Sequence, residues 1–246
     1  MKLISSNIEG SKHLDRILPF IIKESPDVLC LQEVFKMDLH HFEKLGYKCH
    51  FLPLTIFMRD GESREHGIAL CSKTEITNSD SMYYLDFETT LPTHDPKNIP
   101  ETVHYGLLHG NIMCGDDTFL CATTHFTWTA HGSRPSLAQT ESLTRLFNYT
   151  DALKSHVLCG DFNIPRHESV LYTQLAEHYS DNVPLQYTSS LDKNIHHLGK
   201  DSEKDFLFSS FMVDYVFTKP PYKATDVRLE FGLSDHAAIV ATISRE

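Results

Sequence analysis

Residues 156–165 read HVLCGDFNIP and join a short apolar run to a polar turn. A continuous apolar run of this length, bounded by turn-forming residues, predicts a buried strand over residues 156–160. The turn that follows contains Asp161 and Asn163, and Asp, Asn and Pro all favour ordinary turns. In α/β proteins, polar side chains directly after buried strands are also where functional sites assemble. A plain turn and a functional turn are therefore both compatible with this stretch alone.

Similar apolar runs recur on both sides of this strand, with helical spacing between some of them. Helices alternate with strands early in the chain and hairpin-like pairs follow, which favours two mixed β-sheets packed together with helices outside. Residues 89–102 are expected to form a long loop rather than a domain boundary, so residues 1–246 are expected to form a single domain. Strands are predicted over residues 2–8, 27–31, 47–52, 67–72, 106–113, 118–125, 213–218 and 237–243, and helices over 14–23, 38–45 and 137–150.

The composition limits the class of partner. The 246 residues carry a formal net charge of −11, and such an acidic chain has no general attraction to nucleic-acid backbones. A nuclease is not excluded, because bound divalent cations and a local basic patch supply attraction. No apolar run approaches the roughly 20 residues that span a bilayer, and no apolar signal core follows Met1. We therefore expect a cytoplasmic protein without stable membrane insertion.

The cysteines and histidines carry little signal of their own. There are six cysteines and no CxxC pair, so neither a zinc knuckle nor a redox pair is indicated. Most of the 16 histidines, such as the pairs at 40–41 and 196–197, are expected on the surface. Buried free thiols are expected at the cysteines within apolar stretches, which are Cys30, Cys71, Cys121 and Cys159.

Polar residues stand at the ends of several predicted strands, where loops converge to build sites. Asp214 interrupts an apolar run, and a buried carboxylate must be paired or functional. His125 is compatible with a satisfied core histidine, and Asp235-His236 with a helix N-cap followed by a surface histidine. The residues at these positions are Asn7, Glu9, Gln32, Glu33, His125, Asp161, Asn163, Asp214, Asp235 and His236.

Taken together and in this order, these residues resemble the endonuclease/exonuclease/phosphatase superfamily, which includes DNase I, repair nucleases, deadenylases, inositol polyphosphate 5-phosphatases and neutral sphingomyelinases. The resemblance covers essentially the whole chain. It implies an α/β (α+β) fold, a four-layer α/β/β/α sandwich with two mixed sheets face to face. The matching segments are SNIEG at 6–10, LQE at 31–33, HGIA at 66–69, THF at 124–126, GDFN at 160–163, VDY at 213–215 and SDH at 234–236.

The resemblance also implies a phosphoesterase that uses Mg²⁺ or Mn²⁺. Glu33 resembles the main metal-binding carboxylate, and Asn7 the asparagine that supports the metal site and the phosphate. Asp235 resembles a further acidic residue near the metal, and Glu9 stands where some members carry an aspartate. Oxygen ligands with several waters are what Mg²⁺ prefers, so zinc is less suitable.

Five other residues resemble the catalytic group of the superfamily. Asp161 resembles the residue that orients or deprotonates the attacking water, and Asn163 the donor to a phosphate oxygen. His236 resembles the histidine on the scissile phosphate, and Asp214 the carboxylate that orients it. His125 fits a phosphate-contacting or leaving-group position. The chemistry agrees, because a cation, an amide and an imidazolium stabilise charge on phosphate oxygens, and Asp214 would raise the histidine pKa.

Two features of the sequence bear on the substrate. Many relatives have Arg near the position of Met212, so one positive charge near the site is absent. Residues 127–134 contain Trp128 and Arg134, which are candidates for stacking on a ring and clamping a phosphate. Packing of Trp128 under its own loop is the alternative.

The predicted reaction is hydrolysis of a phosphodiester of the nucleic-acid or tyrosyl–nucleic-acid type. Small or single-stranded nucleic acid fits the acidic charge better than a long duplex. A lipid or inositol phosphate is an alternative substrate. A catalytically silent binding module on the same fold is an alternative of another class, and a metallohydrolase acting on other esters or amides is a third. The sequence makes no prediction of oligomeric state.

Overall fold

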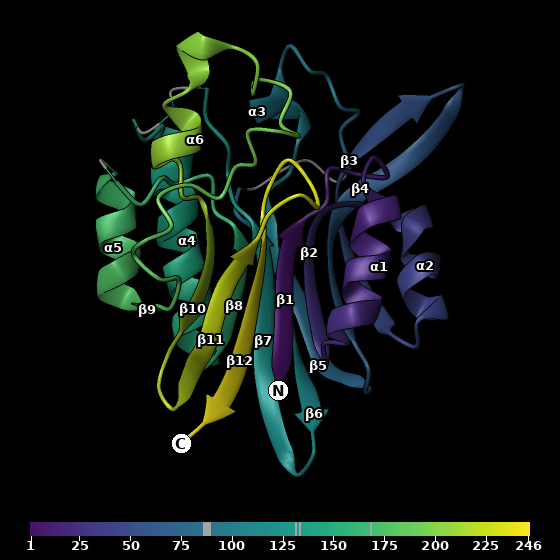
Figure 1. The fold of residues 1–246 in the computed structure, drawn as a ribbon, viewed down its shortest axis with the longest axis vertical. Coiled ribbons are helices and arrows are strands. Elements are labelled where there is room, and N and C mark those ends of the chain that lie inside the picture. Colours follow the sequence, from purple (N-terminus) through teal and green to yellow (C-terminus); the bar gives the residue numbers. More distant parts are fainter. Residues whose placement is uncertain (86–89, 131, 133, 168) are drawn as a thin grey trace.

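Two six-stranded β-sheets pack face to face with helices outside them in a computed structural model of the chain (Figure 1). The structure describes residues 1–85, 90–130, 132, 134–167 and 169–246. The sheets have the strand orders β11-β12-β1-β2-β4-β3 and β5-β6-β7-β8-β10-β9. Each combines parallel and antiparallel neighbours. The predicted fold class, two mixed sheets in a sandwich, is confirmed.

The first sheet is built around the N-terminal strand, which runs parallel to β2 and antiparallel to β12. The predicted strands are present, and two of them, β3 and β4, are longer than predicted because their outer halves also pair with each other as a hairpin. The strands are β1 (Lys2–Asn7), β2 (Val28–Phe35), β3 (Lys48–Arg59), β4 (Glu62–Ser72), β11 (Tyr222–Glu230) and β12 (Ala238–Arg245).

The second sheet contains the strand that precedes the GDFN segment. β6 and β7 form the predicted hairpin, and β8 lies parallel to β7 and antiparallel to β10. The GDFN aspartate, Asp161, is the last residue of β8. The strands are β5 (Ile76–Tyr83), β6 (Gly106–Cys114), β7 (Asp117–His125), β8 (Val157–Asp161), β9 (Ser180–Asp181) and β10 (Asp214–Thr218).

Two pairs of longer helices cover the outer faces of the sheets, with α1 and α2 beside β1 and β2, and α4 and α5 beside β8 and β10 (Figure 1). No helix in the described ranges is long and apolar enough to cross a membrane. The helix predicted over residues 38–45 is shorter, since a 3₁₀ turn (Lys36–Asp38) precedes α2. The helices are α1 (Leu14–Glu24), α2 (Leu39–Lys44), α3 (Ile99–Thr102), α4 (Leu137–Leu153), α5 (Val170–His178) and α6 (Leu207–Ser210), with a second 3₁₀ turn at Ser202–Lys204.

The loop predicted over residues 89–102 ends in the short helix α3, and Thr89 lies outside the described residues. Both α3 and α6 lie at the end of the sandwich toward which β1 points (Figure 1).

Alternate residues of the central strands enter two different cores. Leu3 and Cys30 lie in the core that includes the space between the sheets, whereas Ile4 and Leu29 pack in the core with Ile17 of α1. Because side chains of a strand point alternately to its two faces, both faces of β1 and β2 are apolar. This explains why these strands read as continuous apolar runs rather than as alternating patterns.

The prediction of a free thiol at Cys71 is wrong. Antiparallel pairing of β3 with β4 places Cys49 opposite Cys71, and the two form a disulfide. The sequence does not predict this pair, because 22 positions separate the two cysteines. Only the register of β3 on β4 brings them together. Cys30, Cys121 and Cys159 are buried free thiols, as predicted.

Candidate active site

The candidate site forms where the ends of several strands meet. Parallel pairing of β7 with β8 sets His125 opposite Asp161, both at the carboxyl ends of their strands. β10 runs antiparallel to β8, so its first residue, Asp214, also pairs with Asp161. Asn7 ends β1 in the other sheet and donates a hydrogen bond across to Asp161. Strand direction and register therefore assemble these residues from distant parts of the chain.

Asp161 is the centre of this group and its side chain is only 2% exposed. One carboxylate oxygen, Oδ1, accepts the backbone N–H of Asn163 at 2.9 Å. The other, Oδ2, accepts from the Asn7 amide at 3.2 Å and lies 3.7 Å from His125 Nε2 and 3.9 Å from His236 Nε2. The carboxylate is thus held in one orientation by donors from both sheets and faces two imidazole rings.

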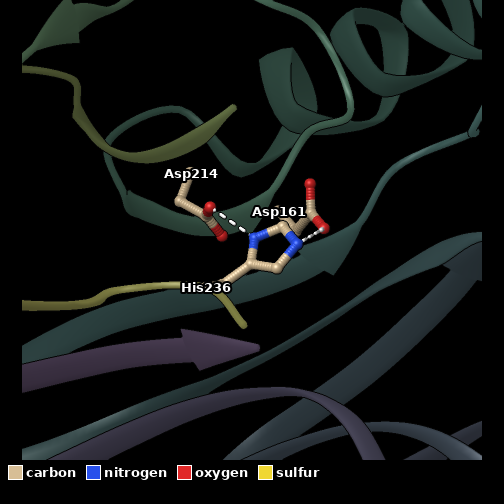
Figure 2. A group of neighbouring side chains, drawn as sticks. All are labelled: Asp161, Asp214 and His236. Atoms are coloured by element: carbon tan, nitrogen blue, oxygen red, sulfur yellow. Dashed lines mark hydrogen bonds and ion pairs between the residues drawn. The ribbon is translucent and has the colours of Figure 1, made fainter. Parts of the chain in front are cut away.

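His236 lies between two buried carboxylates, as Figure 2 shows. Its Nδ1 is 2.8 Å from Asp214 Oδ2, and its Nε2 faces Asp161. Burial by itself would lower the pKa of His236, but Asp214 and Asp161 outweigh burial and raise that pKa well above its usual 6.5. The ring is therefore an imidazolium at neutral pH, and Asp214 is its counter-ion.

Asn163 has a strained backbone and a partly committed side chain. Its φ is +51°, in the left-handed region that Asn tolerates better than most residues. The side-chain amide donates one hydrogen bond to the carbonyl of Phe126 at 2.9 Å. Because an Asn amide carries two N–H groups, one donor is used by this contact and a second is available. Asn163 also lines the cleft described below.

Glu33 and Asn7 form the other half of the group. The Asn7 amide donates to Glu33 Oε1 at 3.0 Å, and His125 Nε2 lies 4.0 Å from the same oxygen. Glu33 has a φ of +55° and sits where the register between β2 and β4 shifts. Such shifts re-aim side chains at functional sites. Its carboxylate is 31% exposed and, like Asp235, it lines the cleft.

A hard divalent cation fits the Glu33 side of the site better than the His236 side. Glu33 and Asp235 offer carboxylate oxygens, which Mg²⁺ and Mn²⁺ prefer. The buried trio of Asp161, Asp214 and His236 also brings its ligand atoms within 4.8 Å of one another. The His236 ring, however, is already paired through Nδ1 with Asp214 at 2.8 Å, whereas the carboxylates of Glu33 and Asp235 face the cleft.

Glu9 has other partners in the structure. Its carboxylate pairs with Lys12 and lies 2.9 Å from His13 Nε2. Its backbone N–H donates to the side-chain oxygen of Asn7 at 3.2 Å. Glu9 lines the cleft, but these contacts fit a residue that orients Asn7 better than a direct metal ligand.

A cleft of about 870 Å³ opens over these residues. Trp128 lines it and is half-buried, whereas Arg134 is exposed and is not among the described residues of the lining. His131 and Ser133, from the same predicted segment, lie outside the described residues. His196, expected on the surface, is half-buried and lines the cleft because residues 191–198 fold over the loop that carries Asp235.

Three residues near the site carried no predicted role. Ser190 accepts the backbone N–H groups of Val213 and Asp214 through its Oγ, both at 3.2 Å. Tyr105 packs edge-on against His125, with ring centroids 5.4 Å apart. His66 lines the cleft, and burial lowers its pKa to about 4. Of these, only His66 stands in a segment that resembles a family motif.

The class of protein comes from the sequence comparison, and the members of that class are hydrolases that act on phosphate esters. The sequence model of the endonuclease/exonuclease/phosphatase family matches residues 4–236. The chain belongs to this family. No curated protein sequence matches the chain.

Solved structures with the same fold come from several organisms. An endonuclease/exonuclease/phosphatase family protein from Leptotrichia buccalis is 18% identical, with 99% of each chain covered and a TM-score of 0.71. The human Nocturnin catalytic domain with bound sulfate is 20% identical, covering 100% of this chain and 94% of that one at a TM-score of 0.70. D. rerio TDP2, complexed with a single-strand DNA product, is 14% identical, covering 99% and 98% at a TM-score of 0.69. At these identities the likeness shows a shared fold.

Proposed function

We propose that the protein hydrolyses a phosphodiester by attack of water, with Mg²⁺ or Mn²⁺ bound by Glu33 and Asp235. The observation that carries the proposal is the environment of Asp161. Its buried carboxylate is oriented by Asn7 and Asn163 and faces two histidines that come from different strand ends. This arrangement suits the positioning of a water molecule beside a phosphate.

Each side chain has a distinct role in the proposal. Asp161 orients the water and accepts its proton. His236, kept cationic by Asp214 at 2.8 Å, donates to a phosphate oxygen on which charge develops. His125 and the free N–H of Asn163 contact further oxygens of the phosphate or the leaving group. A bound divalent cation supplies additional neutralisation of phosphate charge.

A nucleic-acid end or a tyrosyl–nucleic-acid linkage is our first choice of substrate. The D. rerio TDP2 structure holds a single-strand DNA product and the Nocturnin structure holds a sulfate, which supports the choice by analogy of fold alone. A lipid or inositol phosphate is the second candidate. A silent binding module is disfavoured, because every acidic and imidazole group that the chemistry requires is present around the cleft.

The test uses the purified full chain and bis(p-nitrophenyl) phosphate with Mg²⁺, Mn²⁺ or EDTA. We expect turnover that requires the metal. Asp161→Asn and His236→Gln should each lower kcat by about 10²- to 10⁴-fold, the usual contribution of positioned acid–base groups.

Two exposed residues of the same types provide matched controls. Asp116 lies in the turn between β6 and β7, and His40 lies on α2. Neither Asp116→Asn nor His40→Gln should change kcat. Turnover that survives EDTA, or that persists in both site variants, contradicts the mechanism. A wild-type protein that is inert on a broad panel of phosphate esters supports the binding module instead.

A further inference from the structure

The cleft offers little positive charge to a substrate. Lys204 is the one lysine or arginine among the described residues of its lining. Four carboxylates and seven imidazoles among the described residues face the same space, and the imidazole of His236 is already paired with Asp214. Every phosphate of a nucleic-acid strand or polyphosphate beyond the scissile one needs cations to compensate its charge. The lining carboxylates are Glu9, Glu33, Asp161 and Asp235.

Much of the remaining lining is apolar and aromatic. On one side, the segment that contains α6 contributes Phe206, Leu207 and Phe211. Phe206 is 51% exposed, and its ring lies edge-on to that of Phe211 with centroids 5.9 Å apart. Phe206, Leu207 and Phe211 together present apolar surface to the cleft, and covering that surface with an apolar group is favourable.

The lining contributed by β3, which lies on the other side of this end of the sandwich from α6 (Figure 1), is also aromatic. Phe57, from β3, stacks on His94 with ring centroids 4.2 Å apart and an interplanar angle of 15°. Tyr105 lines the space as well. A cleft of about 870 Å³ is the size of sites that enclose one small organic molecule. The residues thus form a pocket for rings and hydrocarbon rather than a channel for a charged strand.

We infer that the substrate is a phosphodiester with a single phosphate whose organic substituent is aromatic or otherwise apolar, and that this substituent binds between the α6 segment and the Phe57 side. The inference rests on the proposed function and refines its substrate. A strand would be engaged through its terminal group alone, with its next phosphate outside the cleft.

The test keeps the leaving group constant and varies the other substituent. The substrates are p-nitrophenyl methyl phosphate and p-nitrophenyl phenyl phosphate; in each, water adds to phosphorus and p-nitrophenolate leaves. Each kcat/KM is divided by the rate of hydrolysis of the same ester by hydroxide, which removes intrinsic reactivity. We expect the phenyl ester to exceed the methyl ester by about tenfold or more, from the added apolar area buried.

A second pair of substrates measures the effect of charge. The p-nitrophenyl ester of thymidine 5′-phosphate is compared with the same ester carrying a 3′-phosphate. Because Lys204 is the one lysine or arginine among the described residues of the lining, and the bound metal is taken up by the scissile phosphate, the additional phosphate should lower kcat/KM several-fold, by roughly the cost of an uncompensated charge. An equal or higher kcat/KM with the 3′-phosphate overturns the inference.

Variants locate the apolar contact. The double substitution Phe206→Ala and Phe211→Ala should lower the phenyl-to-methyl ratio toward one. Phe231→Ala is the matched control, since Phe231 is 46% exposed but does not line the cleft, and its ratio should equal that of wild type. A wild-type ratio near one overturns the inference while metal-dependent turnover of both esters upholds the proposed function. Failure to hydrolyse any of the esters contradicts the proposed function itself.

Discussion

Ser190 is a buried residue that connects the two sides of the His236–Asp214 pair. Its hydroxyl accepts from the backbone of Val213 and Asp214, and its carbonyl accepts the N–H of Ala237 at 2.7 Å. It touches the backbone beside both members of the pair. Ser190 is a positioning residue, because it bonds to the backbone of Asp214 and Ala237 and would act on the reaction only by holding Asp214 and His236 in place.

Ser190→Ala should lower kcat about tenfold while KM changes little, because buried N–H groups lose their acceptor and Asp214 shifts. The same loss should destabilise the fold by about 1–3 kcal/mol. The comparison is Ser72→Ala, a buried serine outside the cleft lining whose hydroxyl accepts the backbone N–H of Thr74 at 3.1 Å. Equal kcat values in steady-state assays of both variants contradict the positioning role.

The stability of the fold should depend on pH through His156, which does not line the candidate active site. Burial lowers its pKa from 6.5 to about 4, so the ring is neutral in the folded protein. As the pH falls, His156 is protonated in the unfolded chain before it is protonated in the folded protein. The contribution of the neutral ring to the free energy of unfolding is therefore complete above pH 6.5 and is lost between pH 6.5 and pH 4.

His156→Gln should therefore flatten the acid side of the stability curve. The wild-type protein should lose up to about 3 kcal/mol more than the variant between pH 7 and pH 4, from 1.36 kcal/mol per pKa unit. Urea unfolding at a series of pH values measures this difference, with exposed His40→Gln as the control. Parallel curves for wild type and His156→Gln contradict the assignment.

At the scale of elements, the missed strands share a location. β5, β9 and β11 are all edge strands, and none was predicted. An edge strand has one strand neighbour and a larger exposed surface, so β5 (ITNSDSMY) carries polar residues that resemble a loop. Central strands such as β2 and β8 are buried on both faces, and their continuous apolar runs were predicted.

The close approach of β7 and β8 depends on Gly160, which has a φ of +145°. A Cβ placed there would lie 2.0 Å from the carbonyl oxygen of Thr124, which is backbone and has little freedom to move. Gly160→Ala should therefore separate the strands at Asp161 and destabilise the protein by about 3 kcal/mol or more, from overpacking combined with backbone strain.

Gly115→Ala is the matched control for that substitution. Gly115 also has a positive φ, +63°, but nothing lies within 4 Å of a Cβ built on it. Its cost should be about 1 kcal/mol, from backbone strain alone. Thermal unfolding and kcat are measured for both, and kcat should fall only for Gly160→Ala. Equal losses of stability would show that strain, not the strand contact, dominates.

At the scale of the whole molecule, metal binding should stabilise the fold, because Glu33 lies on β2 and Asp235 just before β12, so only the folded chain brings the two proposed ligands together. At a Mg²⁺ concentration 100 times Kd, the gain is about 2.7 kcal/mol. For a chain of this size that raises Tm by about 5–10 °C. Glu33→Gln should abolish the shift, whereas Glu177→Gln, an exposed residue of α5, should retain it. A shift of equal size in both variants contradicts the assignment of Glu33.

The sequence by itself determined the family and the two-sheet sandwich, and it predicted which acidic, amide and imidazole groups form the candidate site. These follow from local patterns, since apolar runs mark central strands and polar residues at their ends mark the site. The order of the motifs along the chain then pointed to phosphate-ester chemistry.

Only the tertiary structure decided the partners of these groups. Glu9 pairs with Lys12 and His13, and Ser190 supports Asp214. The disulfide and the cation-poor lining of the cleft likewise became visible only in the folded chain. The physical reason is that such contacts depend on strand register and loop paths, which join residues as far apart as Asn7 and Asp161. Local sequence patterns do not predict contacts between residues so far apart in the chain.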